Sequence, residues 1–305
     1  MNTVEAVIFD FGGVLCFPPT ERQISEAAAL CRLDVPAFPA GVTDGIIDAH
    51  TRGIVTSTSL MACGAAFDQS VRQAAAHPAL GVGIHLTLVE EEPVADPRDI
   101  PTLAGLSGRL PGNYRELIFG VAVGRIRRKD LETEMRAQVE KCRAAGVQPT
   151  HVDSHQHVHA FPAVLGIVLR IATSYGIRGI RLPLDSPWSG GGFWSGRVAG
   201  KLALTLMARH DARAIRAAGL RTCRRAAGIF RSGALSEARL LDIIEGIGEG
   251  DTELVCHPGY EDAILRERYQ HWNYHWESEC DALTSAAVQR AIAERGIVLA
   301  NYRDL

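Results

Sequence analysis

Short apolar runs alternate with longer amphipathic segments along the chain. The short runs are rich in β-branched residues, which is typical of buried strands. The longer segments repeat apolar residues every three or four positions, which is typical of helices that bury one face. Strands are predicted at residues 4–9, 54–61, 81–88, 177–182, 253–260 and 297–302, and helices at residues 21–33, 41–50, 65–76, 131–145, 161–175, 202–217 and 285–295.

This alternation predicts a mainly parallel sheet whose strands are joined by crossover helices. A chain of 305 residues is long enough for two domains or for one large α/β barrel. Titratable residues stand within or at the carboxyl ends of several predicted strands, and a barrel gathers such positions at one face. We therefore expect one α/β barrel domain, residues 1–305, with its site at that face.

Composition and charge narrow the function classes. A hydrophobic fraction of 47% and a charged fraction of 22% are ordinary for a globular protein, and the net charge of −3 gives no sign of nucleic-acid binding. The seven cysteines are scattered and form no C-x-x-C pair, which favours reduced thiols in a cytoplasmic protein. Neither a secretory signal nor a membrane span is expected. The oligomeric state is left open, with a homodimer as one possibility.

The most informative stretch is T-H-V-D-S-H-Q-H-V-H-A-F at residues 150–161, where four histidines and one aspartate fall within nine positions. In a strand, alternate residues share a face, so these side chains would form one row. In a helix, His151, His155 and His159 would gather through their i, i+4 spacing. Either arrangement brings imidazole nitrogens together, as a divalent metal requires. A solvated histidine cluster is the alternative interpretation.

Other titratable residues occupy comparable positions. Asp10 follows the first apolar run, His85 lies inside a strand, and His257 ends another strand. A turn aspartate and a hydrogen-bonded core histidine are the alternatives for Asp10 and His85. Arg181 stands near the end of the strand predicted at 177–182, where it would bind a sugar hydroxyl or form a structural ion pair.

Two excursions between the elements are expected to cover the site and to select the substrate. Residues 90–112 are rich in proline, glycine and acidic residues, and residues 183–200 are rich in glycine, serine and tryptophan. Trp188, Trp194 and the aromatic cluster at 271–276 are suited to stacking on a sugar, or to packing against the barrel.

A series of motifs occurs along the chain in a fixed order. They are G-I-V-T-S-T-S-L-M at 53–61, G-I-H-L-T-L at 83–88, T-H-V-D-S-H-Q-H-V-H at 150–159, V-C-H-P-G at 255–259, L-T-S at 283–285 and Y-R-D-L at 302–305. In this set the chain, from Gly41 onward, resembles the YdjC-like carbohydrate deacetylases, which include chitooligosaccharide deacetylases and hopanoid-biosynthesis-associated proteins.

The resemblance implies a distorted (β/α) TIM-like barrel with one divalent metal ion, Mg²⁺ or Zn²⁺. It implies removal of the acetyl group from an N-acetylated amino sugar of the chitooligosaccharide or glycolipid type. The metal ligands would be His85, His155 and an N-terminal aspartate.

The chemistry of the residues agrees with this set. Two histidines and one carboxylate leave open positions for water on a metal, and a base and an acid complete amide hydrolysis. His257 is the candidate acid, and Asp153 would orient an imidazole ring. His157 and His159, with Arg181, are expected behind the metal ligands or beside the substrate.

The N-terminal segment departs from the deacetylase pattern. Its motif F-D-F-G-G-V-L resembles the start of haloacid dehalogenase-type hydrolases over about the first forty residues, but the second aspartate usual in the phosphatases is replaced by Gly12. The deacetylases begin with N-A-D-D-F-G, whose aspartates are base and metal ligand. Matching the strands places Asp10 at the ligand position and Phe9 at the base position. Counting back from Gly53 without a gap instead places the family's aspartate pair at Asp34 and Val35.

Three function classes therefore stay open. The first is a metal-dependent deacetylase, weakened by the missing base. The second is a dehalogenase-like phosphatase with Asp10 as nucleophile. The third is a non-catalytic metal- or sugar-binding barrel.

Overall fold

A computed structural model describes residues 6–11, 41–64, 66–186, 197–261, 265 and 269–305, with only the backbone described for residues 6–11 and 197–199. The helix predicted at 21–33, the alternative pair Asp34 and Val35, and Trp188 and Trp194 lie outside these residues.

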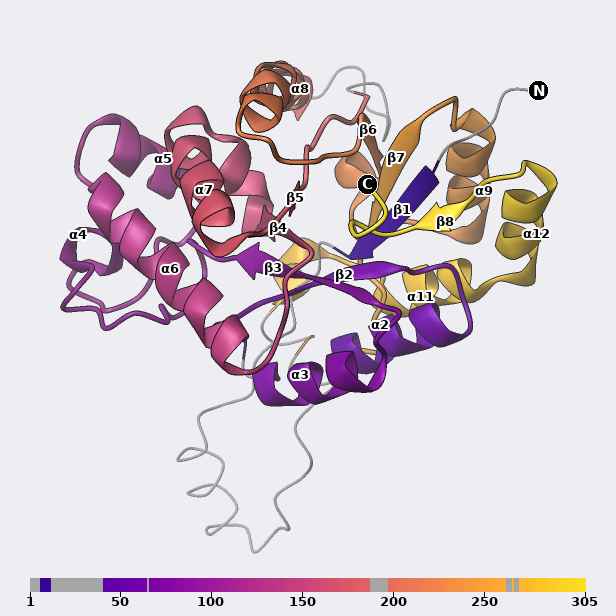
Figure 1. Cartoon of the computed structure of the whole chain (residues 1–305), viewed down its shortest axis with the longest axis horizontal. Coiled ribbons are helices and arrows are strands. Elements are labelled where there is room, and N and C mark those ends of the chain that lie inside the picture. The colour runs from indigo at the N-terminus through magenta and orange to yellow at the C-terminus, as the bar shows by residue number, and fades with distance from the viewer. Residues whose placement is uncertain (1–5, 12–40, 65, 187–196, 262–264, 266–268) are drawn as a thin grey trace, which may run out of the picture.

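The described strands form one parallel sheet (Figure 1). They follow the order β5-β4-β3-β2-β1-β7-β6, and β8 pairs with β1. Their bounds are β1 (Ala6–Phe11), β2 (Ser57–Leu60), β3 (Gly81–Leu86), β4 (His151–Ser154), β5 (Gly179–Ile180), β6 (Arg225–Ala227), β7 (Asp251–Cys256) and β8 (Leu299–Ala300).

The two ends of this order meet, and the sheet closes on itself. Gly179 of β5 forms a parallel bridge with Arg221, the Ile180 N–H donates to the Arg221 carbonyl at 2.9 Å, and the Ala226 N–H donates to the Leu184 carbonyl at 3.0 Å. The fold is therefore a distorted (β/α) TIM-like barrel, as predicted from the alternation of elements and from the resemblance.

Helices surround the strands (Figure 1). The apolar face of α7, with Val164, Ile167 and Ile171, is buried against the rest of the core, as its helical spacing predicts. The helices are α2 (Gly41–Thr51), α3 (Phe67–Ala76), α4 (Pro101–Ala104), α5 (Tyr114–Ala122), α6 (Arg128–Ala144), α7 (Pro162–Tyr175), α8 (Arg197–Ala217), α9 (Glu237–Gly246), α11 (Trp276–Thr284) and α12 (Ala286–Glu294), with short 3₁₀ turns η1 (His155–Ala160), η2 (Ile229–Arg231) and η3 (Gln270–Trp272). In the described part of the chain, no helix has both the length and the apolar surface needed to cross a bilayer.

The segment with the dehalogenase-like motif supplies β1, which lies between β2 and β7. The strand extends to Phe11, so Asp10 is part of it rather than of a following loop. In register, Asp10 pairs with Ser57 of β2 and with Val255 of β7. The backbone of residues 6–11 is thus part of the same sheet as β2, β7 and β8.

Candidate functional site

The histidine-rich run changes conformation halfway. Residues up to Ser154 belong to β4, and η1 begins at His155. Inside η1, Gln156 (φ 53°) and His157 (φ 53°) adopt left-handed backbone angles that non-glycine residues seldom take. The run is therefore neither one strand nor one α-helix, and its five titratable side chains do not form a single row.

His151, the first of the run, is a core histidine. Its ring stacks on Tyr302 with centroids 4.0 Å apart, and its nitrogens lie within hydrogen-bonding distance of Thr150 Oγ1 (2.8 Å) and Ser59 Oγ (3.3 Å). Gly83 of the intervening strand makes room for this ring, because a Cβ there would lie 2.4 Å from a ring carbon. This close approach explains the glycine in the motif G-I-H-L-T-L.

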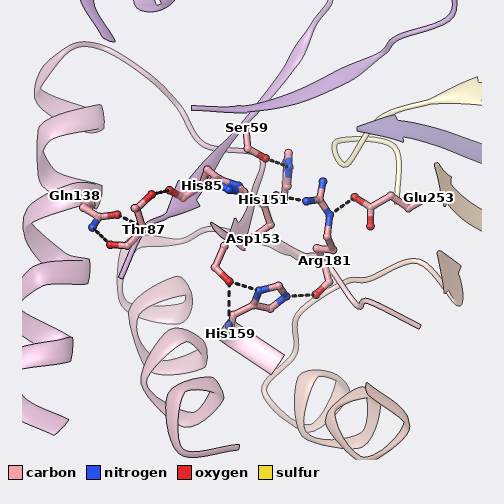
Figure 2. Close-up of polar contacts among 10 residues, drawn as sticks. Ser59, His85, Thr87, Gln138, His151, Asp153, His159, Arg181 and Glu253 are labelled. Atoms are coloured by element: carbon pink, nitrogen blue, oxygen red, sulfur yellow. Dashed lines mark hydrogen bonds and ion pairs between the residues drawn. The ribbon is translucent and has the colours of Figure 1, made fainter. Parts of the chain in front are cut away.

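Asp153 connects His85 to a buried ion-pair chain (Figure 2). His85 Nδ1 lies 2.9 Å from one carboxylate oxygen of Asp153, and Arg181 Nη1 donates to the other. Arg181 Nε donates to Glu253 of β7 at 2.8 Å. The side chains of Asp153, Arg181 and Glu253 are fully buried. Of the two roles considered for Arg181, this geometry favours the structural ion pair.

The charge state of Asp153 follows from these partners. Burial alone would raise its pKa, but the positive charge of Arg181 and the hydrogen bond from His85 outweigh that effect and hold the pKa well below its ordinary value. Asp153 is therefore an anion, which can only accept hydrogen bonds. His85 must then carry its proton on Nδ1.

In a neutral imidazole, a proton on Nδ1 leaves Nε2 with a lone pair. His85 Nε2 is buried and has no hydrogen-bond partner among the described residues. A buried polar atom without a partner is costly unless something else binds it. A histidine whose other nitrogen donates to a carboxylate is the usual arrangement of a metal ligand.

His155 lies beside His85, with ring centroids 5.7 Å apart. Its Nε2 is 2.9 Å from a carboxylate oxygen of Glu90, whose other oxygen accepts from Gln156 Nε2 at 2.7 Å. The ring centroid of Trp272 lies 5.4 Å from that of His155. Burial lowers the pKa of His155, and the hydrogen bond to Glu90 partly offsets this.

His159 is buried, and His157 is half-buried. The main chain and the imidazole of His159 both contact Ser154 Oγ, and its Nε2 is 3.0 Å from the Arg181 carbonyl. Burial lowers the pKa of His159 to about 4 and that of His157 well below its ordinary value. Both rings are thus neutral near pH 7.

His257 follows β7, as the sequence predicts. Its backbone N–H donates to Glu279, and its ring lies 4.9 Å from Tyr274 and 6.4 Å from Trp276. Burial raises the pKa of Glu279 to about 7, although its carboxylate accepts several backbone N–H groups. The aromatic cluster predicted at 271–276 therefore packs around His257 as well as around His155.

A divalent metal fits part of this arrangement. The two histidines present suitable nitrogens side by side, but within the described residues no group of three His, Cys, Asp or Glu side chains is placed to hold a metal. The expected third ligand is Asp10, whose side chain is not described. Its register through Ser57 puts the Asp10 backbone level with Gly81, four residues before His85 in β3. The assignment of Asp10 stays a prediction.

The excursion after β3 borders a cavity next to the site. A space of about 440 Å³ is lined by Glu90, Leu110, Glu116 and Phe119, among other residues of this excursion and of α5. Arg109 and Arg125 also line it. This position agrees with the expectation that residues 90–112 help to select the substrate.

Several residues of the site were not predicted from the sequence. Glu90 and Gln156 contact His155 or its partner, and Glu253 completes the ion-pair chain, whereas Trp272 belongs to the aromatic cluster predicted at 271–276. Glu253 carries a detectable signal, since a glutamate at the start of the apolar run E-L-V-C is unusual for a buried strand. Glu90 and Gln156 carry no signal that distinguishes them from neighbouring residues.

Fold and site together define the class: a parallel TIM-like barrel with one histidine–carboxylate pair at the carboxyl ends of the neighbouring strands β3 and β4, and a second pair just beyond them. Comparison with known proteins then gives the family. The sequence model of YdjC-like proteins matches residues 37–294, and the chain belongs to that family.

Two relatives match over most of their length. A carbohydrate deacetylase from Geobacillus stearothermophilus is 33% identical over 268 residues, covering 88% of this chain and 93% of the relative. A chitooligosaccharide deacetylase from Salmonella paratyphi B is 30% identical over 290 residues, covering 92% of this chain and all of the relative. A solved structure of a proposed cellobiose-phosphate cleavage protein from Enterococcus faecalis is 25% identical, with a TM-score of 0.67, and the match covers 100% of this chain and 99% of that one.

Proposed function

We propose that this protein is a metal-dependent hydrolase that removes the acetyl group from an N-acetylated amino sugar of the chitooligosaccharide or glycolipid type. The main support for a metal is His85 Nε2, which is buried without a partner among the described residues while Nδ1 is held by Asp153. The names of the two relatives support the reaction class. The scattered cysteines support a reducing, cytoplasmic setting.

One divalent ion, Mg²⁺ or Zn²⁺, would be held by His85, His155 and Asp10. Imidazole ligands lean toward the transition metals. When bound, such an ion polarises the amide carbonyl and lowers the pKa of a water molecule.

The residues of the chain supply orientation and protons. Asp153 fixes the ring of His85, and Arg181 holds Asp153 in place. Water adds to the acetyl carbon, the C–N bond breaks, and acetate and a free amine form. In this scheme His257 gives a proton to the leaving nitrogen. The burial of Arg181 and His159 supports roles behind the ligands rather than in sugar contact.

A general base is missing from this set, because Phe9 stands at the position that resembles the base of the family. We therefore expect low acetate release from the wild-type chain. Phe9→Asp should increase it, as a positioned base contributes about 10²-fold or more. Wild-type turnover that Phe9→Asp does not improve would contradict the missing-base hypothesis.

Metal content and two product assays test the proposal. His85→Ala, His155→Ala and Asp10→Asn should each lose bound Zn²⁺, whereas His210→Ala, a change at an exposed histidine, should keep it. The wild type should release acetate from an N-acetylglucosamine oligomer. Stoichiometric metal in both His85→Ala and His155→Ala would refute the site. Release of phosphate from a phosphate monoester without acetate release would favour the dehalogenase-like alternative. Bound metal with neither activity would favour a non-catalytic barrel.

A further inference from the structure

His155 is held by a pair of side chains that the proposed function does not use. Glu90 contacts His155 Nε2 through one carboxylate oxygen and Gln156 Nε2 through the other. The amide oxygen of Gln156 in turn accepts the N–H of Tyr114 at 3.0 Å. We call Glu90 and Gln156 the His155 clamp.

Backbone strain is concentrated around this clamp. Among the described residues, four non-glycine positions have positive φ: Glu90 (69°), Gln156 (53°), His157 (53°) and Asn273 (53°). The first three belong to the clamp or adjoin it, and Asn273 follows Trp272, whose ring contacts His155. Such conformations cost about 1–3 kcal/mol each and persist where the surrounding structure enforces them, often at functional sites.

The loop that carries Glu90 is fixed at several points. The amide of Gln138 in α6 both accepts from the Thr87 N–H (2.9 Å) and donates to the Thr87 carbonyl (2.6 Å). The Tyr269 hydroxyl donates to Glu91 at 2.7 Å. Glu90 is therefore placed by its neighbours before any ligand arrives, as a residue that orients a ligand-binding side chain must be.

The carboxylate of Glu90 decides which nitrogen of His155 carries the proton. A carboxylate accepts hydrogen bonds, and Glu90 faces Gln156 Nε2 with one oxygen and His155 Nε2 with the other. The proton of a neutral His155 then lies on Nε2, and Nδ1 keeps its lone pair. Nδ1 makes no hydrogen bond within the described part of the chain.

We propose that Glu90 is a positioning residue that holds His155 as the Nε2–H tautomer, so that His155 presents Nδ1 to a ligand while His85 presents Nε2. The two histidines are thus fixed by different carboxylates in opposite tautomers. The part of the inference that concerns a metal rests on the proposed function, whereas the tautomers do not.

Nitrogen-15 spectra of the imidazoles in the metal-free protein test the tautomers directly. The His155 signals, assigned by their loss in His155→Gln, should show a protonated Nε2 and an unprotonated Nδ1. Glu90→Gly should convert them to a mixture of tautomers. Glycine is chosen because it removes the carboxylate and accepts the positive φ of this position without strain. Glu90→Gln, which retains an acceptor oxygen, should keep the wild-type pattern.

Zn²⁺ titration by calorimetry supplies a second measurement. Loss of a carboxylate that orients a metal ligand typically weakens affinity by about 10- to 100-fold, and we expect this of Glu90→Gly. Glu92→Ala is the matched control, because Glu92 is two residues away, 63% exposed and paired with Arg109. It should change neither measurement.

Two results would overturn the inference. One is a wild-type His155 that carries its proton on Nδ1. The other is a Glu90→Gly variant with unchanged imidazole signals. If the wild type binds no Zn²⁺, the proposed function fails, and the spectra still decide the role of Glu90.

Discussion

Two histidine–carboxylate pairs lie side by side in this barrel, and they are held in different ways. His85 and Asp153 stand opposite each other on neighbouring strands, so strand register alone brings them together. Their side chains are 2% and 0% exposed. His155 and Glu90 follow the same two strands in irregular backbone, where Glu90 itself and Gln156, the residue after His155, have positive φ; the side chains of His155 and Glu90 are 7% and 17% exposed.

The two pairs differ in the interactions that stabilise them. Behind the pair His85–Asp153, the guanidinium of Arg181 contacts both Asp153 and Glu253. We call His85–Asp153 the sealed pair; because Asp153 is a fully buried charge, this pair depends on Arg181. The pair His155–Glu90 depends on hydrogen bonds and on local backbone conformation. We expect substitutions around the first pair to cause large losses of stability, and substitutions around the second pair to cause small ones.

The largest effect should come from removing the arginine of the sealed pair. Arg181→Met leaves Asp153 and Glu253 buried without their cation, which should lower the free energy of unfolding by about 3–5 kcal/mol. Urea denaturation measures it. Arg170→Met is the control, because its pair with Glu132 is 59% exposed on the arginine side and should cost at most about 1 kcal/mol. Equal losses in the two variants would remove the distinction between sealed and exposed pairs.

The next-largest effect is a pH dependence of the free energy of unfolding. It arises from His159, whose Nε2 lies 3.0 Å from the carbonyl oxygen of Arg181. Burial lowers its pKa from 6.5 to about 4, so the unfolded chain binds the proton at higher pH than the folded protein does. This contribution to stability is present above pH 6.5 and is lost as the pH falls toward 4, by up to about 3 kcal/mol.

Urea unfolding of wild type and His159→Gln at pH 7 and pH 4.5 measures this contribution. The variant should lose less stability than the wild type between the two pH values. Parallel losses would show that His159 is not the group that titrates.

The sealed pair was the more predictable of the two. Its residues stand in short apolar runs, and alternation along β4 correctly puts His151 and Asp153 on one face. Adjacent parallel strands then bring His85 and Asp153 together. The sequence could not show that Arg181 also pairs with Glu253, because this contact depends on how the sheet closes into a barrel.

The second pair could not be predicted from the sequence, because it depends on a local, strained backbone conformation. Nothing in the sequence Q-H indicates that Gln156 and His157 take positive φ, which is unfavourable for both residues. Helix α5 was likewise missed, although Asn113 caps it by accepting from Arg115 and Glu116. The strands β5 and β8, at two residues each, are shorter than their apolar runs because sheet pairing ends before the hydrophobicity does.

The smallest effect separates strain from hydrogen bonding in the second pair. Gln156→Ala and Gln156→Gly remove the same contacts with Glu90 and Tyr114, but only glycine accepts φ 53° without cost. The alanine variant should therefore be less stable than the glycine variant by about 1 kcal/mol. Thermal or urea denaturation of the two Gln156 variants measures the difference. Gln148→Ala serves as a control on another loop. If alanine is as stable as glycine, the backbone at 156 carries no strain, and the His155 clamp is held by its hydrogen bonds alone.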